Sequence, residues 1–299
     1  MNPAVPWIDA PDLEARLDGI GADASSRAFA HGLARDGFAV VDLDPETLLL
    51  CERAAADVEP LLTRPGIGRV QDAWRRSAAV HALALDPRIE RLLASAYGRT
   101  PFPFQTLNFR EGSEQAVHAD SFHFHSDPAG FMCGVWIALE DVSPEAGPVV
   151  YYPGSHRLPV LTPESLGAPA AASHAEVEGL YSRAVRELIS AHDLQPARAL
   201  IRKGQAFVWA ANLLHGGEAI ARPGLTRRSQ VVHVYFEDCF YFTPRTSRGG
   251  RAVARLPADL RTGGWAWPRR QGRRAAVQPK FVAEALLRRV TRRPYVLPR

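Results

Sequence analysis

Apolar positions follow two different periods along the chain, and the change between them separates a helical part from a β-rich part. Within the first hundred residues, segments 28–38 and 45–64 place apolar side chains at three- and four-residue steps, which is typical of amphipathic helices, and the second helix is expected to begin at Pro45. Between them, the run FAVVDL at 38–43 predicts one buried strand. This part is expected to cover the core rather than to hold a functional site.

From Phe102 onward the chain changes to short apolar runs separated by Gly, Pro and Ser, a pattern that is typical of closely connected strands. These runs occupy residues 102–110, 115–124, 132–142, 147–152, 197–217 and 227–242. Residues from about 173 to 193 interrupt them with Val177, Tyr181 and Val185 on one helical face, which predicts an inserted amphipathic helix. Residues 280–293 predict a closing basic helix. Its apolar face, with Val282, Leu286 and Val290 and with Ala285 and Leu287 alongside, is expected to dock on the core, and Arg289, Arg292 and Arg293 are expected on or near the outer face. The pattern as a whole predicts an all-β core with a helical cover.

The chain shows no internal repeat and no low-complexity linker, so we expect a single domain over residues 1–299. In this interpretation the helical cover ends at about residue 100, the β core occupies about 101–243, and a basic extension occupies 244–299. The hydrophobic share of 46% and the charged share of 23% are ordinary for a globular protein.

Cysteine usage and hydropathy bear on where the protein works. Three widely spaced cysteines, Cys51, Cys133 and Cys239, predict reduced thiols and a reducing compartment. The N-terminus lacks the basic and apolar regions of a signal peptide, and no apolar stretch approaches the length of a membrane span. We therefore expect a cytoplasmic protein without a membrane partner.

Charge is distributed unevenly along the chain. Residues 244–299 hold 15 of the 36 basic residues but only two of the 32 acidic ones. A basic segment of this kind can attract phosphate or carboxylate groups, although charge runs more often form a solvated surface. The solvated surface is the favoured interpretation, and an acidic substrate is kept as the alternative.

Three residues predict a metal site. His118 and Asp120 are two positions apart, so in a strand they point to the same face and can converge on one ion. His215 ends the apolar run AFVWAANLLH and precedes two glycines that allow close backbone approach. Two imidazoles and one carboxylate leave coordination positions open, as a ferrous ion requires to bind a 2-oxo acid and O₂ together. A second pair, His125 and Asp127, is the weaker candidate because Pro128 follows it and predicts a turn.

A possible carboxylate site follows His215 in the sequence. On a strand, Arg227 and Ser229 face the same side while Arg228 points outward. A guanidinium group binds a carboxylate through two parallel charge-assisted hydrogen bonds, which suits the far end of 2-oxoglutarate. His233 continues the same inward face.

These segments together resemble the phytanoyl-CoA dioxygenase family of Fe(II)- and 2-oxoglutarate-dependent oxygenases. The resemblance rests on QAVHADSFHF, on CGVWIALEDVSPEAGPVVYYPGSHR and on HGGEAIARPGLTRRSQVVHVYFE, and it covers about residues 107–237. It implies a double-stranded β-helix, the cupin-like jelly-roll barrel, wrapped by helices. It also implies an enzyme that uses Fe(II), 2-oxoglutarate and O₂ and releases succinate and CO₂ while it oxidises a substrate.

The resemblance also implies roles for individual residues. His118, Asp120 and His215 match the family's metal ligands, Arg227 matches its 2-oxoglutarate anchor, and Trp136 stands where the family packs an aromatic beside the co-substrate. Two polar residues on the preceding segments, Asn108 and Gln115, are further candidates for contact with co-substrate or substrate. Halogenases of the family replace the carboxylate ligand by a small residue. Because Asp120 is present, hydroxylation of a small molecule is the favoured reaction.

Two other functions stay open at this point. A non-catalytic, metal-binding cupin-like protein would keep the histidines without needing Arg227 and Ser229 together. An oxygenase acting on nucleic acid would use the basic C-terminal segment, but the sequence shows no pattern of base-stacking aromatics, so this partner is disfavoured.

Overall fold

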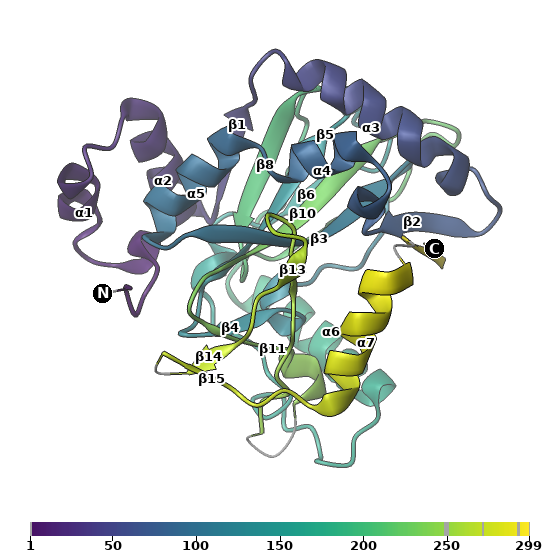
Figure 1. Ribbon diagram of the computed structural model, residues 1–299. Coiled ribbons are helices and arrows are strands. Elements are labelled where there is room, and N and C mark those ends of the chain that lie inside the picture. The colour runs from purple at the N-terminus through teal and green to yellow at the C-terminus, as the bar shows by residue number, and fades with distance from the viewer. Residues whose placement is uncertain (1, 248–250, 271, 292–293, 299) are drawn as a thin grey trace.

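The architecture is described by a computed structural model that covers residues 2–247, 251–270, 272–291 and 294–298. Its main sheet has seven strands in the order β1-β8-β5-β10-β3-β2-β16, all paired antiparallel (Figure 1). The bounds of these strands are β1 Phe38–Asp42, β2 Ile67–Gln71, β3 Pro101–Phe109, β5 Met132–Ala138, β8 Gln205–Ala210, β10 Ser229–Phe236 and β16 Tyr295–Pro298. Strands far apart in sequence therefore lie side by side.

Helices from the first hundred residues cover one face of this sheet (Figure 1). They are α2 Ala24–Asp36, α3 Thr47–Leu62, α4 Ala78–Ala84 and α5 Pro87–Tyr97, with the short α1 Leu13–Gly19 beside them. Local signals fix their ends: the Ser77 hydroxyl accepts from the backbone of Val80 at the start of α4, and Gly98 ends α5 in a left-handed conformation. This arrangement confirms the predicted helical cover.

The opposite face of the sheet carries the smaller elements. A two-stranded sheet, β11-β4, lies below the main sheet with α6 His174–Ala191 beside it (Figure 1). A separate three-stranded sheet has the order β7-β6-β9. Their bounds are β4 His125–Asp127, β6 Val149–Tyr151, β7 Ala197–Arg198, β9 His215–Gly217 and β11 Phe240–Phe242. The helix α6 is inserted between β6 and β7, as predicted, and begins with a capping box formed by Ser173 and Glu176. Helix cover, large sheet and small sheet together form the predicted jelly-roll architecture.

The alternation of side chains along the strands gives the main sheet two different faces. Val135, Val208 and Val232 point toward the helices and join the large apolar core. The neighbouring residues Trp136 and Trp209 point the other way, into a second apolar cluster. Because successive side chains alternate across a strand, each strand contributes to both layers. The inner face is the one available for a site.

Several boundaries differ from the sequence-based expectation. The second long helix begins at Thr47, two residues after Pro45. Residues 115–124 are not a strand: His118 makes an isolated bridge, and a 3₁₀ turn follows at Asp120–Phe122. Strand β2 was not predicted, because its sequence IGRVQ has only two apolar side chains. It pairs with β3 and with β16, so the first hundred residues contribute two strands rather than one.

The C-terminal extension folds back over the molecule. It contains the two-residue strands β12 Ala258–Asp259, β13 Gly264–Trp265, β14 Arg269–Arg270 and β15 Arg273–Arg274, and then α7 Pro279–Thr291. The expected closing helix is present, but the expected docking face is wrong in part, since Ala285 is buried whereas Leu286 is 57% exposed. The side chains of Arg289, Arg292 and Arg293, which we expected on the outer face, lie outside the described residues.

The three cysteines are free and buried, in agreement with the prediction of reduced thiols. In the described part of the chain, no helix is long and apolar enough to cross a membrane.

Candidate metal centre and cavity

The two segments that carry the candidate ligands are held together by their backbones. The amide of His118 donates to the carbonyl of His215, and the amide of His215 donates to the carbonyl of His118, both at 2.8 Å. His215 begins β9 rather than ending the preceding strand, which stops at Ala210. Gly216 allows this approach, because a Cβ there would lie 2.8 Å from the carbonyl oxygen of Gln115. The pairing fixes both imidazoles on one side of the small sheet.

His118, Asp120 and His215 offer ligand atoms that all lie within 4.8 Å of one another. Within the described ranges, no other group of three His, Cys, Asp or Glu side chains meets this condition. Asp120 reaches the cluster because the chain turns into a 3₁₀ helix at that residue. The structure therefore brings together the three side chains that the sequence suggested as ligands.

The hydrogen bonds of both imidazoles orient them for a metal. The Nδ1 atom of His118 lies 2.9 Å from the carbonyl oxygen of Ala116, and that of His215 lies 3.0 Å from the carbonyl oxygen of Leu213. A carbonyl can only accept, so Nδ1 carries the proton in each ring and Nε2 keeps its lone pair. Metal-bound histidines in proteins usually have this arrangement.

Asp120 is buried and held in place by hydrogen bonding. The indole Nε1 of Trp209 donates to its Oδ2 at 2.8 Å, and the Nε2 atom of His233 lies 3.7 Å from the same oxygen. Burial raises the pKa of Asp120, but its interactions with the nearby histidines, His233 foremost, and the hydrogen bond from Trp209 bring the net pKa below its usual value. The group is thus an anion at neutral pH.

Burial acts on the pKa of the His118 imidazole in the opposite direction. It lowers the pKa of His118 to about 3, with the neighbouring His215 adding to the effect. A neutral imidazole and an ionised carboxylate are the forms that bind a divalent metal. Two nitrogens and one oxygen with open positions suit Fe(II) better than a closed zinc site. The donor set therefore fits ferrous iron.

The cluster lines a cavity of about 590 Å³ between the main sheet, α6 and the C-terminal extension. Besides the metal cluster, its lining includes the side chains of Arg69, Gln105, Gln115, His123, Phe124, Trp136, Glu178, Trp209, Arg227, His233, Arg245, Arg255 and Leu297. The cavity is large enough for a co-substrate and a small organic molecule together.

Arg227 is 2% exposed, and one of its terminal nitrogens donates to the carbonyl oxygen of Gly147 at 3.0 Å. Its Nε and the hydroxyl of Ser229 are buried without a hydrogen-bond partner. Burial lowers the pKa of Arg227 to about 10, so the side chain is still charged at neutral pH. The guanidinium lies 5.2 Å from the centre of the Trp136 ring. A buried cation without a carboxylate partner is costly, so this arrangement fits an acidic ligand.

Of the other candidate residues, two lie at the cavity and one does not. Gln115 and Trp136 line the cavity, and the amide of Gln115 lies 3.2 Å from Nε2 of His118. The prediction for Asn108 is wrong, because its side chain lies on the helical face of β3, where it donates to Gln230 at 3.3 Å beneath α4. Gln105, Leu107 and Phe109 are the residues of that strand that line the cavity, since alternate residues face opposite sides.

The second candidate pair is placed apart from the cluster. His125 and Asp127 lie on β4, where Asp127 is exposed and lies 3.8 Å from the guanidinium of Arg270. The ring of His125 packs beside Phe242. His123 and Phe124, which lie between the two pairs in sequence, line the cavity, whereas His125 is not among its lining residues.

Sequence reasoning missed several cavity residues. Trp209 lies in the apolar run that leads to His215, and nothing in that run indicates that its indole donates to Asp120. Arg69, Arg245 and Arg255 come from segments far from the metal ligands in sequence, and only the fold brings them to the same cavity. The sequence carries no local signal for such convergence. The direction of the Arg69 side chain can be inferred from strand alternation only once β2 has been recognised as a strand.

Comparison with known proteins agrees with this geometry. Residues 51–229 match the phytanoyl-CoA dioxygenase family, PhyH. The chain belongs to this family. The match covers both segments that carry the metal-ligand candidates and extends to Ser229, so the resemblance drawn from the sequence motifs is confirmed.

Individual relatives match over shorter stretches. A bovine phytanoyl-CoA dioxygenase domain-containing protein 1 is 36% identical over 90 residues, which are 25% of this chain and 31% of the relative. The mouse protein of the same name is 32% identical over 74 residues, or 23% of this chain and 25% of the relative. The chain thus matches a third or less of the length of these curated relatives.

Solved structures share the fold over most of the chain. The non-haem α-ketoglutarate-dependent epimerase SnoN from nogalamycin biosynthesis superposes with a TM-score of 0.56 at 24% identity, covering 75% of this chain and 87% of SnoN. EctD from S. alaskensis with bound Fe gives a TM-score of 0.54 at 18% identity, covering 72% and 76% of the two chains. These likenesses confirm the jelly-roll fold predicted from the sequence.

The geometry predicts which of the two His-x-Asp pairs holds the metal. Asp120→Ala should weaken Fe(II) binding by more than about 100-fold, because removal even of groups that only orient a ligand costs 10- to 100-fold. Asp127→Ala, the matched control, should bind iron normally. Fe(II) titration of both variants followed by anaerobic calorimetry checks this. Normal iron binding by Asp120→Ala would contradict the assignment.

A second prediction concerns the support of Asp120. Gly134 on β5 faces Trp209 on β8, and a Cβ at Gly134 would overlap the indole ring. Gly134→Ala should therefore lower the free energy of unfolding by about 1–3 kcal/mol and displace the donor to Asp120. Fe(II) affinity should fall by roughly tenfold.

Gly179→Ala is the matched control, because this glycine lies in α6 with open space around its Cβ position. It should stabilise the protein by about 0.5–1 kcal/mol and leave iron binding unchanged. Trp209→Phe should weaken iron binding without the steric clash. Denaturant unfolding and iron titration separate these effects, and unchanged iron affinity in both Gly134→Ala and Trp209→Phe would refute a supporting role for Trp209.

Proposed function

We propose that this protein is an Fe(II)- and 2-oxoglutarate-dependent dioxygenase that hydroxylates a small molecule and releases succinate and CO₂. The observation that carries the proposal is that a His-Asp-His cluster and a buried, charged arginine face the same cavity. A metal-binding protein without this activity would have no use for Arg227 at that place. Family membership and the fold support the same conclusion.

In this proposal each residue has a defined part. His118, Asp120 and His215 would hold the ion. Arg227 and the hydroxyl of Ser229 bind the distant carboxylate of 2-oxoglutarate, with Trp136 against its chain. When bound, the metal supplies the activation of O₂ that is coupled to decarboxylation of the co-substrate. Gln115 is a further contact near His118.

The chain itself contributes orientation and exclusion of water. Trp209 and the two backbone carbonyls fix the directions of the three ligands, so their geometry is set before the metal binds. The aromatic side chains Phe124 and Trp136 give part of the cavity wall an apolar surface, which would strengthen charge interactions beside it. Because Asp120 occupies the carboxylate position, there is no vacant ligand position of the kind a halogenase uses. Hydroxylation is therefore the reaction we propose.

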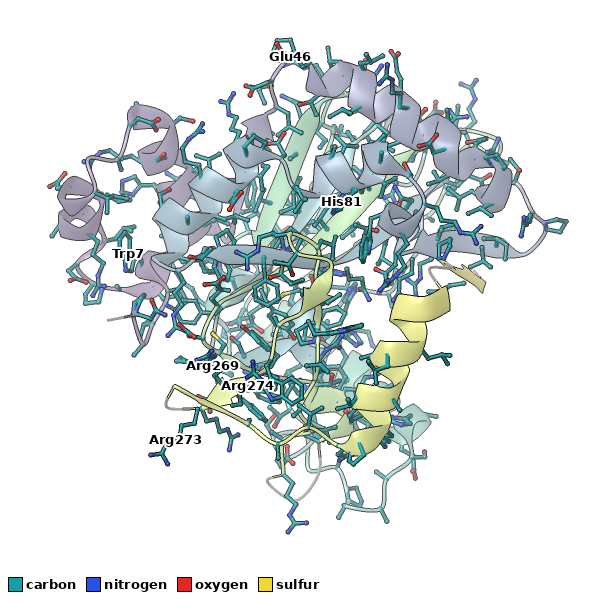
Figure 2. The ribbon with its side chains drawn as sticks, viewed as in Figure 1. Trp7, Glu46, His81, Arg269, Arg273 and Arg274 are labelled. Carbon is teal, nitrogen blue, oxygen red and sulfur yellow. The ribbon has the colours of Figure 1, made fainter. Side chains whose placement is uncertain are left out.

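The proposed substrate is a small molecule rather than a nucleic acid. Among the structures with this fold, one holds SnoN with nogalamycin RO and another holds EctD with 5-hydroxyectoine. In the C-terminal extension, Arg269 and Arg270 are near Asp238 and Asp127, and Arg273 projects away from the body of the molecule (Figure 2). These arginines form an outer surface and do not line the cavity. We place the protein in the cytoplasm on the basis of its reduced cysteines, and this location is part of the proposal.

Substitution of two neighbouring arginines, Arg227 and Arg228, tests the proposed co-substrate site. Arg227→Ala should raise the apparent KM for 2-oxoglutarate about 100-fold or more, because paired charge-assisted hydrogen bonds to the carboxylate are lost. Iron binding should be retained. The measurement is succinate release against 2-oxoglutarate concentration, alongside iron titration.

Arg228→Ala is the matched control. Arg228 points outward and pairs with Glu140 at 2.9 Å and with Glu59 at 3.2 Å, on a surface that is partly exposed. Its removal should cost about 1 kcal/mol of stability or less and leave the KM for 2-oxoglutarate unchanged. Equal KM effects in the two variants would mean that Arg227 is not the anchor. No succinate release by the wild type with any candidate substrate would count against the enzyme function itself.

A further inference from the structure

The cavity contains more positive charge than the proposed reaction uses. Its ionisable carboxylates and guanidinium groups are those of Asp120, Glu178, Arg69, Arg227, Arg245 and Arg255. Asp120 belongs to the metal cluster and Arg227 to the proposed co-substrate site. The other four side chains lie outside both, and three of them are arginines.

Two of these arginines have structural partners. Arg245 forms an ion pair with Glu178 of α6 at 2.9 Å, which neutralises both charges. Arg255 donates to the hydroxyl of Thr243 at 3.2 Å, and its guanidinium lies 4.6 Å from the centre of the Phe124 ring. Both arginines fix the C-terminal extension against the wall of the cavity.

Arg69 differs from them. It lies on β2, where its Nε is buried without a hydrogen-bond partner. Burial lowers the pKa of Arg69, and no carboxylate in the described residues offsets that effect. Its cross-strand neighbour on β16, Leu297, lines the cavity beside it. The side chain of Arg69 as a whole is half-buried. A ligand oxyanion that pairs with it would therefore offset the desolvation of its buried Nε.

The position of Arg69 separates it from the co-substrate. In the sheet order, Arg227 precedes β10 and its guanidinium lies over Trp136 of β5, whereas β2 lies on the other side of β10. With strands about 4.8 Å apart, β2 is roughly 10 Å from β10 across the sheet. The side chains between them that face the cavity, Gln105 and Leu107, are on β3. Arg227 and Arg69 therefore lie on opposite sides of β10 and β3, and the proposed co-substrate site is on the side of Arg227.

We propose that Arg69 binds a carboxylate or phosphate group of the substrate, at the end of the cavity formed by β2 and β16. The inference rests on the proposed function and adds the substrate class, an oxyanion-bearing small molecule. The substrate lies along the inner face of β3, between the metal and Arg69. Its anionic group is fixed at the far end while the bond to be oxidised lies near His118 and Asp120.

The test measures binding to the protein loaded with Fe(II) and 2-oxoglutarate under anaerobic conditions. The probes are hexanoate and phenylacetate beside their amides, and hexyl phosphate and phenyl phosphate beside hexanol and phenol. Thermal shift and calorimetry report the affinity of each probe. The proteins are wild type, Arg69→Gln, Arg69→Lys and the control Arg186→Gln, which changes an exposed arginine of α6.

The wild type and Arg186→Gln should bind the anionic member of at least one pair about tenfold or more tightly than the neutral member. Arg69→Gln should lose this preference, and Arg69→Lys should retain part of it. The pair with the larger loss shows whether carboxylate or phosphate is the group bound. Equal binding of anionic and neutral probes by the wild type, or an unchanged preference in Arg69→Gln, would overturn the proposal.

The same experiment distinguishes failure of this inference from failure of the proposed function. Binding is measured without turnover, so a preference that depends on Arg69 stands even if the protein releases no succinate. Conversely, if a neutral compound stimulates equal succinate release in the wild type and Arg69→Gln, the enzyme function stands and the role of Arg69 is refuted.

Discussion

The reciprocal backbone pairing of His118 and His215 is the contact on which the site depends. Two hydrogen bonds of 2.8 Å join segments that are almost a hundred residues apart, and neither involves a side chain. Both imidazoles then donate from Nδ1 to carbonyls of their own segments, at Ala116 and Leu213. The backbone therefore sets the spacing, orientation and tautomer of the two rings, and Asp120 follows from the turn after His118.

The motifs predicted the candidate metal ligands because metal binding requires particular residue types. The strand spacing of His118 and Asp120 can be recognised within a short segment of the sequence. The same reasoning found Arg227 and Ser229, which share a face, and placed Arg228 outside. It failed for Asn108, since a polar residue on a strand has two faces to choose from and only the register with β10 decides between them. Asn108 instead satisfies part of its hydrogen bonding beneath α4.

The main elements of the fold were predictable for a similar reason. Helix α6 carries apolar side chains at helical spacing and a capping box, so its bounds could be estimated to within two residues. Strand β2 could not be predicted, because its pairing with β3 and β16 compensates for a weak apolar pattern. Long-range pairing of this kind overrides local preference, and it also brings Arg69 and Leu297 to the cavity.

The fold shows that the C-terminal extension contributes to the cavity as well as to the surface. Its charge suggested a solvated surface, and Arg273 does point outward (Figure 2). However, Arg245 and Arg255 form part of the cavity wall, and β16 supplies Leu297 at its edge. The candidate metal ligands and the proposed co-substrate anchor lie within the family match, which ends at Ser229, and so does β2. The segment after the match adds further side chains to the cavity wall, so substrate recognition in this chain should depend on residues beyond 240 as well as on β2.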